Sequence, residues 1–301
     1  MSRTVNPHTG KSYGVQAVCK TLAVPRSTHY ARKQRAQAPP PAPARRGPKP
    51  KVPDAELLAL IRADLDASRF TMEGYRKVWA RLRFVLKVRV GKHRVLRLMR
   101  EHNLLSPLRV PARPEKAHEG TIIPMGPNLL WGTDGTQVYT LQDGNAWIFA
   151  ATDHFNAECV GWHVAKFGNH QAALEPIKQG LETRYGGVGE QVALGLSLRR
   201  DNGPQYLAEG FHRQVRHWGI TISPALVYEP ETNGCIERFW RTLKEQCIYG
   251  RVFNTLADLE AAVRRFIEDY NRHWRVERLG FKTPSEARKN HINPEPQTTA
   301  A

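Results

Sequence analysis

The spacing of hydrophobic positions changes along the chain and divides it into two kinds of structure. Up to about residue 110 apolar side chains recur every three to four positions, which predicts amphipathic helices. After Pro124 they gather in short β-branched and aromatic runs between tight turns, which predicts strands. Residues 37–53 are rich in proline and basic side chains, so this stretch predicts an extended linker.

The first helical part, residues 1–36, contains two short helical patterns. Val15, Val18, Cys19 and Leu22 follow helical spacing, and a second pattern restarts with polar and basic residues after Pro25. This is the outline of a helix-turn-helix, although other helical hairpins share it. Its second helix would present to DNA the side chains of Arg26, Ser27, Thr28 and Tyr30.

The second helical part, residues 54–110, predicts three amphipathic helices. Each carries an apolar stripe on one face and basic side chains on the other, which is the pattern of a DNA-binding helical module. A small helical bundle with a solvated basic face is the alternative. The candidate DNA contacts of this module are Arg76, Lys77, Lys92, Arg94 and Arg97.

Residues 120–250 predict an α/β domain. Three strand patterns at 129–140, 146–155 and 158–167 are joined by short turns and predict an antiparallel meander. A helix at 169–185, a strand at 192–201, a helix at 206–219 and a strand at 220–225 follow. We therefore expect a mixed five-stranded sheet with helices, then a helical extension over 251–291 and a disordered tail over 292–301.

The net charge of +17 lies in the helical part. Residues 1–110 hold 24 basic and 6 acidic side chains, whereas the remainder holds 21 basic and 22 acidic ones. Such asymmetry predicts a polyanion-binding region, with nucleic acid as the favoured partner, and a solubilising basic tail as the alternative. The absence of a membrane span or a signal peptide indicates a cytoplasmic, nucleoid-associated protein without a membrane partner. The four cysteines are scattered, so neither a disulfide framework nor a zinc site is expected.

Three carboxylates stand where the predicted elements could bring them together. Asp134 lies inside the first strand, Asp201 ends the fourth strand, and Glu237 lies on a helix whose apolar face is formed by its neighbours. Asp201 precedes Asn-Gly, so a simple turn residue is the alternative for it. Converging carboxylates bind hard divalent cations, and two such ions stabilise the entering and leaving oxygens of a phosphoryl displacement.

The sequence around these acids resembles a known family. "WGTDGTQV", "RRDNGPQY", "PETNGCIERFWRTLKEQ" and "YNRHWRVERLGFKTPSEA" resemble the retroviral-integrase-like core of IS-three family insertion-sequence transposases, OrfB type. "VGKHRVLRLMREHNLLSP" resembles the helix-turn-helix that precedes this core. The resemblance implies an RNase H-like core in which Asp134, Asp201 and Glu237 form a DDE triad that binds two Mg²⁺ ions, with Mn²⁺ as a substitute.

The resemblance also implies a function. It is that of a transposase that binds the element's terminal repeats and target DNA and catalyses strand cleavage and strand transfer. Homo-oligomers and an OrfA partner or fusion are the implied protein partners. The alternatives are a catalytically silent DNA-binding regulator and an RNase H-type nuclease.

The resemblance and the helix faces together give candidate DNA contacts near the acids. Arg241 and Lys244 match family positions beside terminal DNA phosphates, and helical spacing puts both on the face of Glu237. The same region contributes Asn202, Arg199 and Arg200. Gly135 departs from the family pattern and is expected to loosen the first strand.

Overall fold

The computed structural model describes residues 4–37, 51–71, 73–106, 124–224 and 234–292. The chain divides into two units, Met1–Pro53 and Asp54–Ala301, and each is described by itself. The first unit contains the two short helices that the sequence predicts, α1 (Val15–Thr21) and α2 (Arg26–Gln37). Cys19 is its buried residue, while Arg26 and Tyr30 are exposed on α2.

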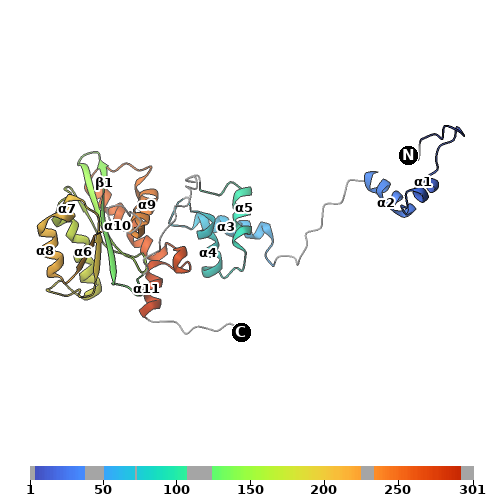
Figure 1. The fold of residues 1–301 in the computed structure, drawn as a ribbon. Coiled ribbons are helices and arrows are strands. Elements are labelled where there is room, and N and C mark those ends of the chain that lie inside the picture. Colours follow the sequence, from blue (N-terminus) through green and yellow to red (C-terminus); the bar gives the residue numbers. More distant parts are fainter. Residues whose placement is uncertain (1–3, 38–50, 72, 107–123, 225–233, 293–301) are drawn as a thin grey trace. The chain divides into compact units, whose positions relative to one another are not determined.

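The second unit begins with the predicted three-helix module (Figure 1). It consists of α3 (Asp54–Asp66), α4 (Tyr75–Ala80) with a π-helical continuation η1 (Arg81–Val85), and α5 (Lys92–Glu101). The apolar stripes of these helices meet in a small core formed by Leu57, Ile61, Val78, Leu82, Val95, Leu98 and Met99. The helical spacing therefore predicted both the elements and their buried faces.

A mixed five-stranded sheet follows, as the sequence predicts. Its strands are β1 (Leu130–Thr140), β2 (Gly144–Asp153), β3 (Cys159–Ala165), β4 (Ser197–Arg200) and β5 (Thr221–Pro224). The order is β3-β2-β1-β4-β5. β1 pairs antiparallel with β2, and β2 with β3, whereas β1 with β4 and β4 with β5 are parallel.

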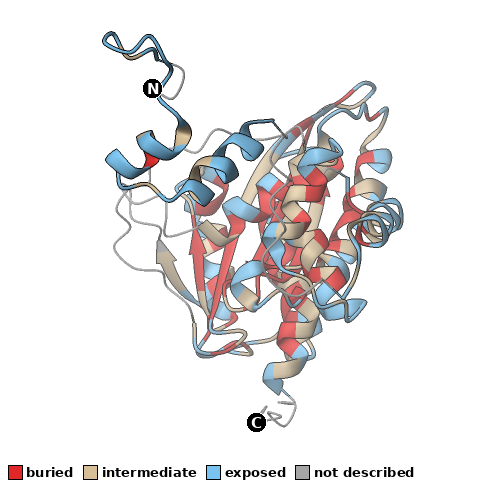
Figure 2. Cartoon of the chain, turned by 90° about the vertical axis from the view of Figure 1, so that its right-hand side faces the viewer, coloured by how far each residue is buried: buried red, intermediate tan, exposed pale blue. Residues whose placement is uncertain are grey.

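Helices cover both faces of the sheet (Figure 1). One face packs against α6 (His170–Tyr185), α7 (Pro204–Leu207) and α8 (Glu209–His217). The other packs against α9 (Gly234–Leu243), the π-helical η3 (Lys244–Ile248) and α10 (Leu256–His273). The chain continues through the short 3₁₀ helix η4 (Glu277–Leu279) to α11 (Pro284–Ile292). The buried residues gather in and around the sheet (Figure 2).

Two elements differ from their predicted bounds. The strand expected over 192–201 is shortened to β4, because Gly195 has a φ of +90° that extended backbone does not adopt. The helix expected over 206–219 is divided into α7 and α8 at Ala208, whose φ of −62° and ψ of 136° are extended. Both differences occur at single residues whose backbone conformation the apolar pattern does not encode.

Gly135 does not loosen the first strand. It pairs with Phe149 in an unbroken β1–β2 ladder that runs from Trp131 to Thr140. A Cβ atom built on Gly135 would lie 2.6 Å from the Phe149 ring. Glycine is therefore the residue that lets this aromatic ring lie flat against the strand.

Buried ion pairs join the end of β2 to the middle of α11. Arg288 donates to Asp153 at 3.0 Å and pairs with Glu158, which also binds Arg184 at 2.6 Å. We call these four residues, Asp153, Glu158, Arg184 and Arg288, the arginine-paired cluster. Asp153 also accepts hydrogen bonds from the backbone N–H groups of Asn128 and Phe155. The cluster thus connects segments that lie more than a hundred positions apart in the chain.

Candidate active site

Asp134 and Asp201 lie level with each other on neighbouring parallel strands. β1 pairs with β4 through Trp131 with Leu198 and Gly132 with Arg199. Continuing this register by two residues sets Asp134 opposite Asp201, which follows directly after the last residue of β4. In an α/β sheet this is the strand end at which functional groups gather.

Glu237 approaches from the helix that covers this part of the sheet. It lies in the first turn of α9, whose side chains Ile236, Phe239, Trp240 and Leu243 are buried against the sheet. Those four positions follow a helical stripe, so Glu237 lies on the exposed side of α9. The sequence pattern predicted both faces of this helix.

The pKa of the Asp134 carboxyl is raised. This pKa is raised to about 6, chiefly by burial and further by the negative charges of Asp201 and Glu237, which together outweigh the lowering effect of the Gly135 N–H and the Trp240 indole. The charges of Asp201 and Glu237 therefore both act on Asp134. We call Asp134, Asp201 and Glu237 the carboxylate triad.

Backbone N–H groups orient two of these carboxylates. The Gly135 N–H donates to Asp134 Oδ1 at 2.7 Å, and the Gly203 N–H donates to Asp201 Oδ1 at 3.0 Å. The second bond closes a turn over Asn202, as the Asn-Gly sequence predicts. Asp201 is therefore both a turn residue and a member of the triad.

Two buried donors lie beside the triad. The indole Nε1 of Trp240 and the hydroxyl of Tyr206 are buried and form no hydrogen bond of normal geometry with a described group, although Trp240 is near enough to lower the pKa of Asp134 and Thr133 near enough to lower that of Tyr206. Burial raises the pKa of Tyr206 well above its ordinary value, and the charges of Asp134 and Asp201 add to that rise. Orphaned buried donors cost free energy, so they are expected at a place built for something besides stability. Sequence analysis missed both residues, because an aromatic side chain in a core pattern gives no sign of an orphaned polar atom.

The chemistry of the triad fits divalent cations. All three groups offer hard oxygen donors, and neither Asp134 nor Asp201 forms an ion pair with a described lysine or arginine. Binding a cation would relieve the repulsion that raises the pKa of Asp134. Within the described residues, no three acidic, histidine or cysteine side chains lie close enough together to hold a metal ion as they stand.

Arg241 at the end of α9 and Lys244 at the start of η3 differ in exposure. Arg241 is exposed and lies 3.9 Å from Glu245, its partner in an i,i+4 pair. The helix changes to π-helical spacing at Lys244, which is half-buried and lines a pocket against β1. The uniform helical spacing predicted from sequence ends at this residue.

Arg199 and Arg200 are buried at the end of β4. Arg200 donates to the Asp201 carbonyl at 2.9 Å and to Asn202 Oδ1 at 3.0 Å, so it holds the turn that carries Asp201. Asn202 itself is exposed. DNA contact by these three residues stays a prediction, and their burial gives the two arginines a clear part in shaping the strand end.

Most of the candidate DNA contacts in the helical module bind other protein groups. Arg94 and Arg97 both pair with Asp54, and Arg76 pairs with Glu277 at 2.6 Å. The Lys77 ammonium lies 3.5 Å from the centre of the Trp274 ring and donates to the Arg275 carbonyl, and burial lowers its pKa to about 7. Lys92 is exposed in the first turn of α5.

Comparison with known proteins identifies the domains. An "Integrase core domain" family matches residues 124–230, a second family of that description matches residues 218–284, and an "HTH-like domain" family matches residues 53–112. A transposase for insertion sequence element IS629 of Shigella sonnei is 26% identical over 289 residues, which are 93% of each chain. The transposase InsD of insertion element IS2 of Escherichia coli is 28% identical over 71% of this chain and 72% of its own.

Among solved structures, the catalytic core domain of BIV integrase is 23% identical, with a TM-score of 0.39, over 56% of this chain and 99% of that one. The matched families define an RNase H-like integrase core preceded by a helix-turn-helix-like module. The integrase core and HTH-like domains, together with the IS629 and IS2 relatives, make the chain similar to insertion-sequence transposases and are consistent with the IS-three family. In the described part of the chain, no helix is long and apolar enough to cross a membrane.

Proposed function

We propose that this protein is a DDE transposase, a polynucleotidyl transferase that cleaves insertion-sequence DNA ends and joins them to target DNA. The observation that carries the proposal is the electrostatic influence of Asp201 and Glu237 on Asp134. Parallel register sets Asp134 beside Asp201, and the pKa of Asp134 responds to both Asp201 and Glu237. The matches to integrase core families over residues 124–284 support the same activity.

The triad would hold two Mg²⁺ ions, with Mn²⁺ as a substitute. Bound ions would supply Lewis acidity at the entering and leaving oxygens of an in-line phosphodiester displacement. The protein's own contribution is to position the carboxylates. The Gly135 and Gly203 N–H groups each hold one carboxylate oxygen, of Asp134 and Asp201 respectively. The buried stripe of α9 holds in place the backbone that carries Glu237.

Neighbouring basic side chains would orient the DNA. Exposed Arg241 and half-buried Lys244 follow Glu237 along α9 and η3, where each could neutralise a phosphate. Exposed Lys92 is the best placed of the candidates in the helical module. Two DNA ends require a paired arrangement, so we infer a homo-oligomer, with an OrfA partner or fusion as a further component. Action on chromosomal DNA places the protein with the bacterial nucleoid in the cytoplasm.

The proposal is tested by Mg²⁺-dependent strand cleavage with the full chain. The substrates are duplexes that carry the terminal repeats flanking its gene, RNA–DNA hybrids of the same sequence, and unrelated duplexes. We expect cleavage at the repeat ends, its loss in Asp201→Asn with DNA binding kept, and its retention in the matched control Glu182→Gln, which changes an exposed acid on α6. Cleavage of hybrids in preference to repeat ends would instead establish an RNase H-type nuclease. Repeat binding without cleavage by the wild-type chain would establish a silent regulator.

A further inference from the structure

One side of β1 is left without a strand partner next to the triad. β2 pairs with β1 from Trp131 to Thr140, but β4 pairs with it only as far as Gly132. The next contact on that side is the isolated bridge between Thr140 and Phe253. Among the residues that the structure describes, no strand pairs with residues 133–139 on this side. We call this stretch the open edge.

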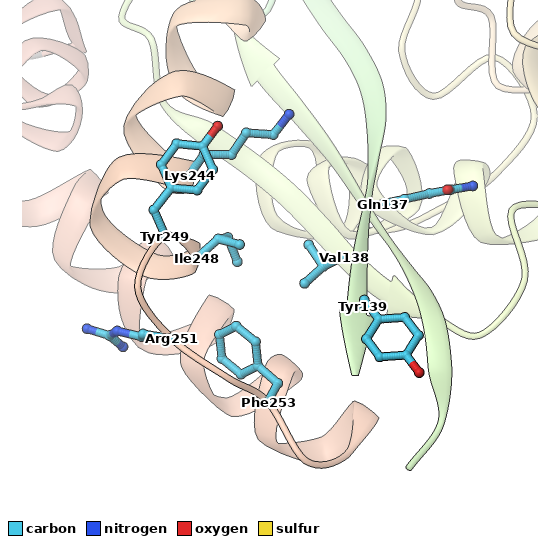
Figure 3. A pocket seen from close by; sticks show the side chains of 8 residues that line it. All are labelled: Gln137, Val138, Tyr139, Lys244, Ile248, Tyr249, Arg251 and Phe253. Atoms are coloured by element: carbon cyan, nitrogen blue, oxygen red, sulfur yellow. The ribbon is translucent and has the colours of Figure 1, made fainter. Parts of the chain in front are cut away.

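A pocket of about 350 Å³ lies against the far half of the open edge (Figure 3). Its lining residues are Gln137, Val138, Tyr139, Lys244, Ile248, Tyr249, Arg251 and Phe253. Three of them are consecutive on β1, and successive strand residues point to opposite faces. The pocket therefore lies at the edge of the sheet between Val138 and Ile248, while Gln137 and Tyr139 point to the other side of the strand (Figure 3). Its volume is within the range of small-ligand sites.

The lining suits an anion attached to a flat ring. It contains two cations and no carboxylate, and neither Lys244 nor Arg251 forms an ion pair with a described acidic residue. Tyr139 and Tyr249 are each 64% exposed, so both rings are open to solvent. Val138, Ile248 and Phe253 supply the apolar wall between them (Figure 3).

The pocket lies close to the triad, both along α9 and η3 and along β1. Lys244 lies seven residues beyond Glu237, which is about 10 Å along a helix. Val138 lies four residues beyond Asp134, which is about 13 Å along a strand. A DNA strand whose scissile phosphate lies at the triad would therefore reach the pocket within a few nucleotides.

We propose that this pocket binds an unpaired nucleotide of the DNA strand that extends from the scissile phosphate. Lys244 and Arg251 neutralise its phosphate, and the ring of Tyr249 stacks on its base. Since a paired base is not available for such stacking, the pocket selects DNA ends that are frayed or carry an unpaired extension. The proposal rests on the transposase function and adds a preference for end structure to it.

The test measures binding, so that it does not depend on cleavage. The full chain is titrated, with Ca²⁺ in place of Mg²⁺, into two fluorescent duplexes of one terminal-repeat sequence. One is blunt, and the other has a short unpaired extension containing 2-aminopurine. We expect the extended duplex to bind about 10-fold more tightly, with quenching of 2-aminopurine by stacking. The double variant Tyr249→Ser/Arg251→Ala should bind both duplexes alike and leave the fluorescence unquenched.

Matched variants separate the pocket from general effects. The control Phe167→Ser/Arg216→Ala also removes an exposed aromatic ring and an exposed arginine, and it should keep the full preference. Tyr249→Phe/Arg251→Lys keeps a ring and a charge and should restore the preference, which shows that loss in the first variant is not misfolding. A preference that survives Tyr249→Ser/Arg251→Ala, or is missing from the wild-type chain, overturns the proposal.

The Asp201→Asn variant distinguishes the two proposals. It should cleave neither duplex and still prefer the extended one. If the wild-type chain shows the pocket-dependent preference without cleaving DNA, the transposase function fails and the pocket stands. If it cleaves repeat ends with no such preference, the pocket fails and the transposase function stands.

Discussion

Two groups of carboxylates on the same sheet show how charge is used for stability and for chemistry. In the arginine-paired cluster, Arg288 and Arg184 bind Asp153 and Glu158 in the protein interior. In the carboxylate triad, Asp134 and Asp201 have backbone N–H donors but no cationic partner among the described side chains. Both groups contain an acid on a central strand, yet Asp153 has a buried cationic partner whereas Asp134 has none among the described residues. An acidic group that the fold brings together without neutralising it is suited to bind cations from outside.

The largest expected effect comes from breaking the arginine-paired cluster. Arg288→Met would leave Asp153 and Glu158 buried without their shared guanidinium, and removing one partner of a buried pair costs about 3–5 kcal/mol. Urea unfolding of the full chain measures this loss. Arg264→Met, which breaks an exposed i,i+4 pair with Glu260, is the matched control and should cost less than about 0.5 kcal/mol. Equal effects of the two changes would contradict the structural role of the cluster.

Neutralising an acid of the triad should raise the free energy of unfolding, whereas breaking the arginine-paired cluster lowers it. The folded-state pKa of Asp134 is about 6, above its ordinary value of 3.8, so the folded protein binds a proton more tightly than the unfolded chain does. Metal-free wild-type protein should therefore lose stability as the pH rises from about 4 to 6 and remain at the lower level above that range. Asp134→Asn should remove this pH dependence and raise the free energy of unfolding by about 1–3 kcal/mol at pH 7.

Urea unfolding in EDTA at a series of pH values measures this gain. Asp66→Asn, an exposed acid on α3, is the control and should leave the pH profile unchanged. Destabilisation by Asp134→Asn at pH 7 would mean that Asp134 belongs with Asp153 as a structural acid.

The basic residues of the helical module also divide into those that bind other protein groups and those that are exposed. Changing one of them should have the smallest of the expected effects. Lys77 lies against Trp274, whereas Lys92 is exposed. Lys92→Ala should weaken DNA binding and reduce the slope of log affinity against log salt by about one, because a phosphate contact is lost. Lys77→Met should leave that slope unchanged. Fluorescence anisotropy at several salt concentrations measures the slope for both variants. A reduced slope for Lys77→Met would show that Lys77 contacts DNA phosphate.

The sequence predicted most of the fold, and its choice of Asp134, Asp201 and Glu237 as site residues stays a prediction. Strand and helix periodicity placed the sheet, the face of α9 and the helical module, because these features depend on neighbours within a few positions. The arrangement of Arg76 with Glu277 and of Arg288 with Asp153 could not be predicted, because each pair joins residues more than a hundred positions apart. A basic residue in a helical stripe looks the same whether it will meet DNA or an acid elsewhere in the fold.

Local backbone changes account for the other differences. The π-helical turn that begins at Lys244 and the φ of +90° at Gly195 are set by packing and by single residues, which apolar spacing does not report. Gly135, expected to weaken β1, is instead required by the Phe149 ring of the neighbouring strand. The pocket at the open edge depends on where β4 ends, and the predicted strand was longer than the observed one.

The central claim is that Asp134, Asp201 and Glu237 form one site for divalent ions. Titration of the metal-free full chain with Mn²⁺, followed by electron paramagnetic resonance of the free ion, tests it most directly. We predict saturable binding by the wild-type protein that is weakened at least about 10-fold in Asp134→Asn, Asp201→Asn and Glu237→Gln, since each change removes a charged oxygen ligand. Glu182→Gln should bind as the wild type does. Wild-type affinity in all three triad variants would contradict the claim.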